Sequence, residues 1–493
     1  MQRDAMRARL DAAREPWDVL VIGGGATGLG CALEAASRGL RTALVERLDF
    51  ASGTSSRSTK LFHGGVRYLR GGHFQLVAQS LRERANARRQ ARELVRETPF
   101  LIPAYRRGER FYYGLGLRLY DRLARGDGSR SRVVSRDDAL RLAPALRPHG
   151  LRGGIVYYDD QFDDARFAVE LARAAVACGA TVMNYAPVRS FLVEGGRVTG
   201  AVVRDDERGD ELEVRARVVV NAAGVFVDDV RRLARPSAAP LLRLSRGAHI
   251  VLERSFLPGD TAVLVPRTDD DRVVFLIPWR ERVLVGTTDT PVDEPLHAPA
   301  CTKADVDYLL EHASRYLARA PVRADVKSAF AGLRPLPAAK GRTANLRRDH
   351  RVEVADGLVT ICGGKWTTYR LMARDAIAAA VRDARLTARS GTLPALTAPP
   401  ESNARLEANL LAGMPLSSED ALEITRLASE EMAVTVEDVL ARRTRTLFLD
   451  ARRAAQAAPF VAGALARACG RDDAWIQHQV TTFAALAAKY LPE

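Results

Sequence analysis

Residues 18–47 read DVLVIGGGATGLGCALEAASRGLRTALVER, and this stretch decides the fold. A run of four apolar residues after the opening aspartate predicts a buried parallel strand, and a glycine-rich turn, an alanine-rich helix and a second apolar run follow. Gly23, Gly25 and Gly28 have the G-x-G-x-x-G spacing, which allows a tight turn beside a pyrophosphate and close packing of helix on strand. The second run ends at Glu46, whose carboxylate can accept hydrogen bonds from ribose hydroxyls. Because these features fall in register, the stretch predicts a dinucleotide-binding βαβ unit.

The composition is that of a folded protein of two or three domains. The chain has 493 residues, of which 47% are apolar and 27% are charged. No run approaches the ~18–20 apolar residues of a membrane-spanning helix, and residues 1–15 carry acids and no apolar core of a secretory signal. Five cysteines lie without C-x-x-C spacing. We therefore expect a cytoplasmic protein with reduced thiols and no metal site.

A formal net charge of +14 suggests an anionic partner. Residues 81–96 interleave acids with arginines, which is typical of a solvated helix. No zinc-finger spacing, RNP-like aromatic motif or basic-region heptad occurs. We therefore expect no nucleic acid as a partner, whereas attraction to acidic lipid headgroups stays open.

Helical and loop segments follow the opening unit. The polar stretch 51–72 is too rich in Ser and Gly for regular structure, and so long a loop in a compact domain is usually functional. Helices are predicted at 73–98, 163–178 and 303–319, with another starting after the glycine pair 363–364. The pattern of 403–490 is helical almost throughout, which predicts a separate C-terminal domain.

Strands are predicted in three places. The runs 188–194 and 198–204 are separated by a Gly-Gly turn and form a hairpin, and a buried strand at 215–224 follows. Four strand-like runs between 249 and 289 suit an antiparallel sheet. The run 351–362 predicts a hairpin that returns to the nucleotide sheet.

Motifs along most of the chain resemble one family of flavoproteins. Ala32 and Gly39 continue an FAD-type fingerprint, and NAAG at 221–224 resembles the late strand and turn of the superfamily that includes D-amino-acid oxidase. Within it, five segments resemble the aerobic, FAD-dependent glycerol-3-phosphate dehydrogenases: TSSRSTKLFHGGVRYL (54–69), GAHIVL (247–252), FLIPWRERVLVGTTDT (275–290), AGLRPL (331–336) and GGKWTTYR (363–370). The resemblance implies oxidation of sn-glycerol 3-phosphate to dihydroxyacetone phosphate, with electrons passing from FAD to a membrane quinone.

The resemblance also implies a domain organisation. We expect an α/β chain with a discontinuous Rossmann-like FAD-binding domain, an inserted antiparallel-sheet substrate domain and a C-terminal α-helical domain. We assign 18–75, 150–240 and 340–387 to the first, 76–149 and 241–339 to the second, 388–402 to a linker and 403–493 to the third. Quinone reduction implies peripheral contact with the inner face of the cell membrane, for which the basic stretches 3–14 and 117–132 are candidates. A homodimer stays open.

The expected substrate is a phosphomonoester dianion that bears a secondary alcohol. Its phosphate calls for cations, and its hydroxyl calls for a base, most often a histidine. Residues in the matching motifs supply both. Of the two histidines in these motifs, His249 is the candidate base and His63 is expected at the flavin, while the identity of the base stays open. We predict His249, Arg334 and Lys365 as catalytic residues, and we predict that substrate binding uses Arg67, Tyr68, His249, Arg334, Lys365 and Thr367.

A second set of residues is expected to contact FAD. The loop hydroxyls and the N–H groups of glycine turns can satisfy phosphate and ring atoms. The predicted set is Gly23, Gly25, Gly28, Glu46, Ser55, Ser58, Thr59, Lys60, His63, Gly224, Gly363 and Gly364.

Three alternatives stay open at this point. One is an oxidase on the same scaffold that uses dioxygen and releases peroxide, because oxygen reactivity depends on access to the flavin rather than on one motif. A second is an amine or amino-acid oxidase of the superfamily, although the predicted cations suit a phosphate better than a carboxylate. A third is a flavin-binding protein without turnover, against which the intact motifs speak.

Overall fold

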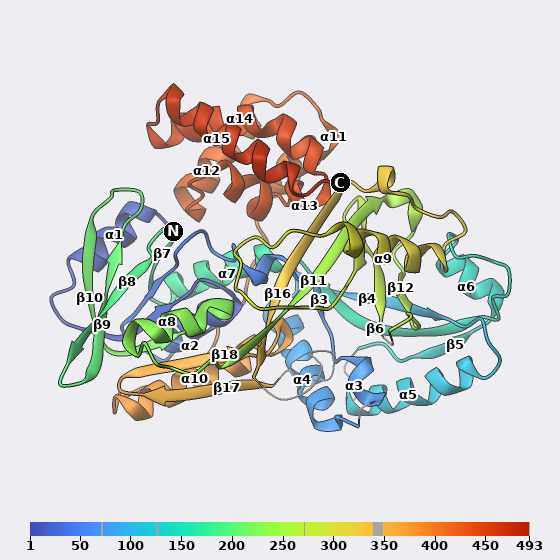
Figure 1. Cartoon of the computed structure of the whole chain (residues 1–493), viewed down its shortest axis with the longest axis horizontal. Helices are drawn as coiled ribbons and strands as arrows, with labels where there is room; N and C mark the ends of the chain where they lie inside the picture. The colour runs from blue at the N-terminus through green and yellow to red at the C-terminus, as the bar shows by residue number, and fades with distance from the viewer. Residues whose placement is uncertain (71, 125, 127, 271, 339–348, 493) are drawn as a thin grey trace.

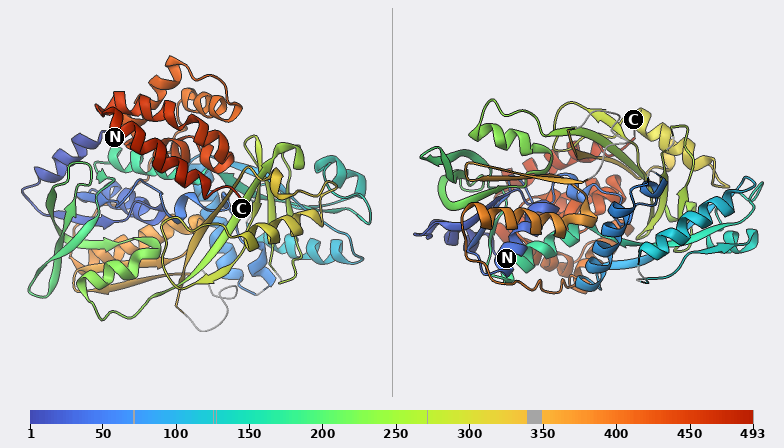
Figure 2. Two further views of the ribbon diagram at one scale, coloured as in Figure 1. Left: turned by 45° about the horizontal axis from the view of Figure 1, so that its top comes forward. Right: turned by 90° about the horizontal axis from the view of Figure 1, so that it is seen from below.

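The computed structural model describes residues 1–70, 72–124, 126, 128–270, 272–338 and 349–492, the side chains of Arg67 and Arg70 excepted. The chain forms two sheets and a group of C-terminal helices (Figure 1). Two further views show that these helices lie across one side of the molecule, over the region where the two sheets meet (Figure 2). The observed fold class is the predicted one.

The smaller sheet is the predicted nucleotide sheet, with the order β17-β18-β10-β1-β2-β7 and with β9 and β8 added beside β10. β1 pairs in parallel with both β2 and β10, and β10 pairs in parallel with β18. The bounds are β1 (Trp17–Ile22), β2 (Thr42–Val45), β7 (Thr181–Met183), β8 (Val188–Glu194), β9 (Arg197–Arg204), β10 (Glu211–Asn221), β17 (His350–Ala355) and β18 (Leu358–Gly363). The central apolar runs are buried because helices cover a parallel sheet on both faces.

Two helices meet closely beside this sheet, α2 (Ala26–Ser37) and α10 (Tyr369–Asp383). A Cβ at Gly30 of α2 would lie 3.1 Å from the Tyr369 ring and 3.2 Å from the Ala373 side chain. The small residues of the opening helix therefore let a segment 340 positions later in the chain complete the nucleotide domain.

The larger sheet has the order β15-β11-β14-β13-β12-β4-β6-β3, with β16 beside β11 and β5 beside β6. Its strand pairs are antiparallel except for β12 with β4. The bounds are β3 (Leu61–Phe62), β4 (Val95–Pro103), β5 (Arg132–Val134), β6 (Gly154–Phe162), β11 (Leu242–Glu253), β12 (Ala262–Val265), β13 (Val274–Trp279), β14 (Arg282–Gly286), β15 (Thr290–Val292) and β16 (Ser328–Pro337). The pair β11–β16 carries the residues that matter most for the site.

Other helices surround the sheets and form the C-terminal group. Those before residue 388 are α1 (Arg3–Asp11), α3 (Val66–Arg70), α4 (Phe74–Gln90), α5 (Glu109–Leu123), α6 (Arg136–Leu142), α7 (Asp164–Ala177), α8 (Val227–Ala234) and α9 (Lys303–Ser314). The C-terminal ones are α11 (Glu401–Ala412), α12 (Ser418–Glu431), α13 (Thr446–Leu449), α14 (Ala451–Cys469) and α15 (Asp473–Ala488). Among the described residues, no helix is both long and apolar enough to cross a membrane.

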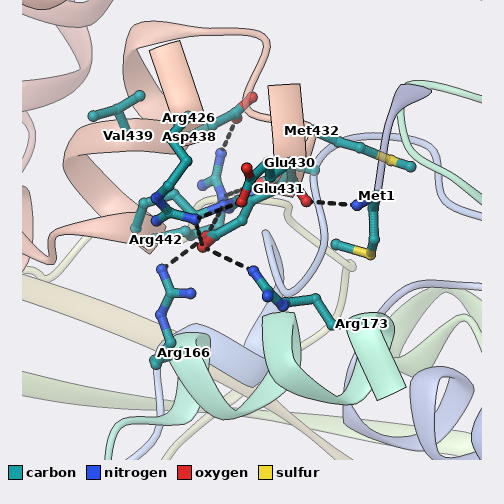
Figure 3. Close-up of polar contacts among 12 residues, drawn as sticks. Met1, Arg166, Arg173, Arg426, Glu430, Glu431, Met432, Asp438, Val439 and Arg442 are labelled. Atoms are coloured by element: carbon teal, nitrogen blue, oxygen red, sulfur yellow. Dashed lines mark hydrogen bonds and ion pairs between the residues drawn. The ribbon is translucent and has the colours of Figure 1, made fainter. Parts of the chain in front are cut away.

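The C-terminal helices dock on the nucleotide domain through buried charges. Glu431 ends α12 and is fully buried, and Arg166 and Arg173 of α7 point toward it (Figure 3). Arg166 Nη2 lies 2.9 Å and Arg173 Nη1 3.5 Å from the Glu431 carboxylate. Because a buried carboxylate needs such partners, the contact specifies how the two parts fit together.

Several predicted boundaries are wrong. The helix expected at 73–98 ends at Gln90, and β4 begins at Val95, where the alternation VRETPFLIP favours a strand that pairs with β6. The stretch 51–72 contains short elements, η1 (Thr54–Ser56), β3 and α3, of which β3 forms because β6 offers it a partner. Helix α9 ends at Ser314 rather than 319. β6 lies inside the range 150–240 assigned to the nucleotide domain, yet it pairs within the larger sheet.

The turn geometry makes Gly28 a sensitive position. A Cβ there would lie 1.8 Å from the Gly23 carbonyl oxygen. We expect Gly28→Ala to lower the free energy of unfolding by ~1–3 kcal/mol and to reduce bound flavin, because the turn must open. Thermal melting and the flavin-to-protein absorbance ratio measure both effects. Gly116→Ala in α5, where a Cβ meets nothing within 4 Å, is the control and should leave both unchanged or raise stability slightly.

Candidate active site

The glycine-rich turn lies between β1 and α2. Gly23 has φ +108°, and a Cβ on it would lie 2.7 Å from the backbone oxygen that follows β10. Gly25, at the N-cap of α2, provides no capping side chain, and Ser55 Oγ accepts a hydrogen bond from Ala26 N at 2.9 Å. Gly28 packs against the same turn. A side-chain-free turn at a helix N-terminus fits the pyrophosphate of a dinucleotide.

Glu46 is held at the end of β2 by backbone N–H groups. Its Oε2 accepts from Gly24 N at 2.5 Å and its Oε1 accepts from Leu48 N at 2.9 Å. Desolvation raises the pKa of this carboxyl. A carboxylate has about four acceptor positions, so Glu46 keeps acceptor capacity for ribose hydroxyls.

Two residues predicted to contact FAD, Ser58 and Lys60, instead turn their side chains to Asp164, at the start of α7. Ser58 Oγ and Lys60 Nζ each donate to Asp164 Oδ2 at 2.7 Å, and Lys60 Nζ also donates to Ser56 O at 2.7 Å. Lys60 has no exposed surface, and burial lowers its pKa to about 7 although Asp164 opposes the shift. Because the side chains of Ser58 and Lys60 are engaged with Asp164, these contacts do not favour the prediction that they bind FAD.

Thr59 lies between them and contacts His249 of β11. Thr59 Oγ1 lies 3.0 Å from His249 Nε2, and the His249 ring stacks on Phe330 of β16 with centroids 5.1 Å apart. The imidazole is 2% exposed, and among the described residues its Nδ1 makes no hydrogen bond. Burial, together with Lys60 and Arg334, holds the pKa of His249 well below its usual value. His249 is therefore a neutral imidazole.

A cavity of about 1550 Å³ lies between the larger sheet and helices α3 and α5. Its wall includes four predicted site residues, Thr59, His63, Tyr68 and Arg334. His249 is not part of the wall, and it reaches the cavity through Thr59. The volume is sufficient for a substrate together with part of a cofactor.

Arg334 projects from β16 and is fixed by three neighbours. Its Nη2 donates to Thr287 Oγ1 at 2.9 Å and to Thr288 O at 3.0 Å, and its Nη1 lies 3.4 Å from Asp289 Oδ1. The guanidinium crosses Gly247 on the paired strand β11, where a Cβ would lie 2.1 Å from Nη2. Its side chain stays 18% exposed on the cavity wall. Arg334 is therefore a cation held in one orientation on the cavity wall.

Two motifs about 300 residues apart come together beside the cavity. Thr367 Oγ1 accepts from His63 N at 3.3 Å, and Trp366 Nε1 donates to Ser55 O at 2.9 Å. Lys365 Nζ lies 5.6 Å from the centroid of the Tyr68 ring. The structure therefore places the predicted substrate residues of both motifs in one region, whereas the predicted side chain of Arg67 lies outside the described residues.

The remaining predicted glycines shape turns next to this region. Gly363 and Gly364 have φ +81° and +73°, and a Cβ would lie 2.6 Å from Asp349 O and 2.2 Å from Met372 Sδ respectively. Gly224, with φ +60°, faces open space. The pair at 363–364 therefore needs glycine for both conformation and room.

One polar cluster of the cavity wall was not predicted. Tyr120 OH donates to Asp159 Oδ1 at 2.6 Å, Arg84 Nη1 donates to the same atom at 2.9 Å, and Gly64 N donates to Tyr120 OH at 2.8 Å. Burial raises the pKa of Asp159 to about 6. The cluster fixes the turn that follows His63. The consecutive acids at 159–160 within an otherwise apolar strand were the available signal.

Comparisons with known proteins agree with this geometry. The family model described as FAD dependent oxidoreductase matches residues 18–379, and the model described as C-terminal domain of alpha-glycerophosphate oxidase matches 359–476. The human protein named glycerol-3-phosphate dehydrogenase, mitochondrial, is 37% identical over 540 residues, which cover 97% of this chain and 74% of that protein. The chain belongs to the FAD-dependent glycerol-3-phosphate dehydrogenase family. The predicted family and the predicted cofactor, FAD, are confirmed.

Further relatives extend the comparison. Glycerol-3-phosphate dehydrogenase 2 of Mycobacterium tuberculosis (strain ATCC 25618 / H37Rv) is 48% identical over 376 residues, covering 75% of this chain and 63% of that protein. The solved glycerol-3-phosphate dehydrogenase of Bacillus halodurans, complexed with FAD, superposes with a TM-score of 0.80 at 29% identity over 99% of this chain and 98% of that one. The L-alpha-glycerophosphate oxidase of Mycoplasma pneumoniae has a TM-score of 0.62 at 20% identity over 78% and 100%, which shows a shared fold.

The lowered pKa of His249 predicts a pH dependence of stability. Below pH ~6.5 the unfolded chain protonates this residue and the folded protein does not, so the free energy of unfolding falls with falling pH, by up to ~1.4 kcal/mol per unit. His249→Gln keeps a group that can bind Thr59 but does not titrate, so we expect it to lose this dependence. Urea unfolding between pH 8 and 5 measures the difference, with the exposed His478→Gln as control. Parallel curves for wild type and His249→Gln would contradict the prediction.

Proposed function

We propose that the protein oxidises sn-glycerol 3-phosphate to dihydroxyacetone phosphate. The observation that carries the proposal is that one cavity wall holds both a fixed guanidinium, Arg334, and a hydroxyl, Thr59, backed by the neutral His249. The guanidinium suits a phosphate dianion, and the Thr59 hydroxyl can take up the substrate's hydroxyl proton as it passes its own proton to His249 Nε2. The names of the relatives support the same substrate.

The chemistry divides between cofactor and protein. The reaction takes a hydride from C2 and a proton from the hydroxyl on it, and bound FAD supplies the hydride acceptor. His249 is our candidate to receive the proton, because it is neutral and its Nε2 faces the Thr59 hydroxyl. Arg334 and Lys365 are our candidates to orient the phosphate. The glycine turn, Ser55 and Glu46 would hold the dinucleotide.

Flavin bleaching tests the proposal directly. Anaerobic addition of glycerol 3-phosphate to the holoenzyme should remove the flavin absorbance band, and addition of an amino acid should not. Retention of the band with glycerol 3-phosphate would refute the substrate assignment. Stoichiometric peroxide in air without another acceptor would identify dioxygen as the acceptor, which the match to an oxidase C-terminal domain keeps as the second candidate.

Arg334 should determine affinity for the substrate. Arg334→Ala removes a charge-assisted partner worth ~1.5–3 kcal/mol, so we expect the KM for glycerol 3-phosphate to rise ~10- to 150-fold while flavin content is unchanged. Steady-state kinetics with a soluble dye acceptor measure the effect. Arg334→Lys should recover part of the loss. Arg405→Ala on α11, half exposed, is the matched control, and an unchanged KM in Arg334→Ala would remove this residue from the site.

We propose further that the electrons pass to a membrane quinone and that helix α5 docks on the anionic inner face of the membrane. Phe111, Tyr112 and Leu115 are 78%, 59% and 62% exposed. Exposed arginines flank them at 106, 107, 110, 118 and 122. Tyr112 and Leu115 also line the cavity, so a membrane at this helix lies next to the site. The other candidate stretch, helix α1, is less suitable for docking because its Arg3 and Arg7 pair with Asp205.

Loss of the apolar face should release the protein from membranes. Each buried Phe or Leu contributes ~1.5–3 kcal/mol, so Phe111→Ser with Leu115→Ser should weaken binding to phosphatidylglycerol-containing vesicles by at least ~100-fold. Quinone reduction should fall with it, while reduction of a soluble dye continues. Leu422→Ser on α12, 69% exposed, is the control. Equal vesicle binding by the double variant and the wild type would exclude α5 as the docking surface.

A further inference from the structure

A buried segment of the C-terminal domain contacts residues 56–60, the site loop that carries Thr59. Residues 438–450 are all buried, and they comprise the π-helical turn η7 (Asp438–Arg443), Arg445 and helix α13. Arg445 has φ +60° and is 1% exposed. A buried arginine in a left-handed conformation costs free energy that its contacts must offset.

Those contacts are made to the loop that carries Thr59. Arg445 Nη2 donates to Ser56 O at 2.8 Å and to Asp164 Oδ1 at 3.1 Å, and Nη1 donates to Ala441 O within its own domain at 2.8 Å. Lys60 Nζ uses the same Ser56 oxygen and the other Asp164 oxygen. Arg445 and Lys60 therefore share the Ser56 carbonyl oxygen, and each binds one oxygen of the Asp164 carboxylate.

This shared pair fixes the backbone on both sides of Thr59. Ser58 N and Oγ donate to Asp164 Oδ2 at 3.0 and 2.7 Å, and Lys60 itself has φ +63°. Between these two fixed residues, Thr59 Oγ1 lies 3.0 Å from His249 Nε2.

A second, apolar route links the same residues. The Arg445 guanidinium lies 4.2 Å from the Phe448 ring centroid, the Phe448 ring lies 4.7 Å from that of Phe330, and Phe330 stacks on His249. The C-terminal domain therefore reaches His249 on the polar side, through Thr59, and on its ring face, through Phe330.

We propose that Arg445 is a positioning residue, by which the C-terminal helical domain holds the Thr59–His249 hydrogen bond in the orientation that proton removal from the substrate requires. The inference rests on the proposed function for the role of His249. Arg445 itself is not part of the cavity wall, so it acts through Asp164, Lys60 and Phe448.

Substitution of Arg445→Met tests the proposal in the holoenzyme. We expect anaerobic flavin reduction to slow by ~10- to 100-fold, as for a misaligned reacting group, with the KM little changed because Arg334 and Lys365 are untouched. The pH profile of the reduction rate should also shift, since His249 faces Thr59, the cations Lys60 and Arg334, and the Phe330 ring. Arg445→Lys, which keeps the charge opposite Asp164, should recover part of the rate.

Arg443→Met is the matched control. Arg443 is a fully buried arginine of the same segment, and it pairs with Asp49 at 2.8 Å and with Glu431 rather than with residues 56–60. We expect Arg443→Met to lower the melting temperature while the reduction rate and its pH profile stay those of the wild type. A wild-type rate and pH profile in Arg445→Met, with only a lower melting temperature, would overturn the proposal.

Amide hydrogen exchange separates this inference from the proposed function. Exchange at residues 57–61 should rise in Arg445→Met and not in Arg443→Met, and this readout requires no turnover. If glycerol 3-phosphate fails to bleach the wild type, the proposed function is refuted, and the exchange data still decide whether Arg445 orders the loop. If Arg445→Met does not fold, Arg445→Lys replaces it, and we expect a smaller increase in exchange at residues 57–61. Unchanged exchange at 57–61 would refute the ordering role.

Discussion

Compensation of the buried Asp164 carboxylate is the interaction on which the site depends. Asp164 has no exposed surface, and its charge is balanced by Lys60 from the site loop and Arg445 from the C-terminal domain. An uncompensated carboxylate at this depth costs several kcal/mol. The start of α7, the loop before β3 and the C-terminal domain are therefore held in one arrangement. The loop that carries Thr59 takes its observed form because all three are in place.

The same principle explains why an arginine-rich chain buries several of its arginines. Arg442 and Arg443 both pair with Asp49, which lies three residues after the Glu46 carboxylate, and Arg166 pairs with Glu431. Apolar contacts alone would allow the C-terminal helices to slide on the sheets. Buried pairs of fixed geometry allow one docking, because any shift leaves a charge without its partner. The C-terminal helices are thus held on the rest of the chain by several buried ion pairs of the same kind.

The sequence predicted what local patterns specify. The glycine turn with its first two strands, the hairpin that turns at Gly195-Gly196 and each helix of the C-terminal domain are encoded by short stretches of neighbouring residues. Family motifs also indicated Arg334, His249 and Lys365, which the structure places around one cavity or just behind its wall. The helix predicted at 73–98 was too long because charged residues continue the helical pattern beyond Gln90. In the folded chain, pairing with β6 makes the segment from Val95 a strand.

Partners that meet only in the folded chain escaped prediction. Ser58 and Lys60 belonged to a motif expected at the flavin, and nothing nearby in the sequence showed that Asp164 would receive them. The Arg84–Asp159–Tyr120 cluster joins a helix, a strand and a second helix. With 74 lysines and arginines in the chain, no local feature distinguishes Arg84 or Arg445 from a surface charge. Their distinction is burial, which only the tertiary structure reveals.

The charges around His249 give the proposed chemistry a definite order. Burial, together with the cations Lys60 and Arg334, lowers the pKa of His249, so the ring is neutral before substrate arrives. A phosphate dianion at Arg334 would offset much of that cation's field, and a nearby anion favours the protonated form of an imidazole. In the proposed reaction, binding of the substrate would therefore raise the proton affinity of His249 when a proton must be accepted. In the proposed reaction, the cation that binds the phosphate would therefore also keep His249 unprotonated until the substrate is bound.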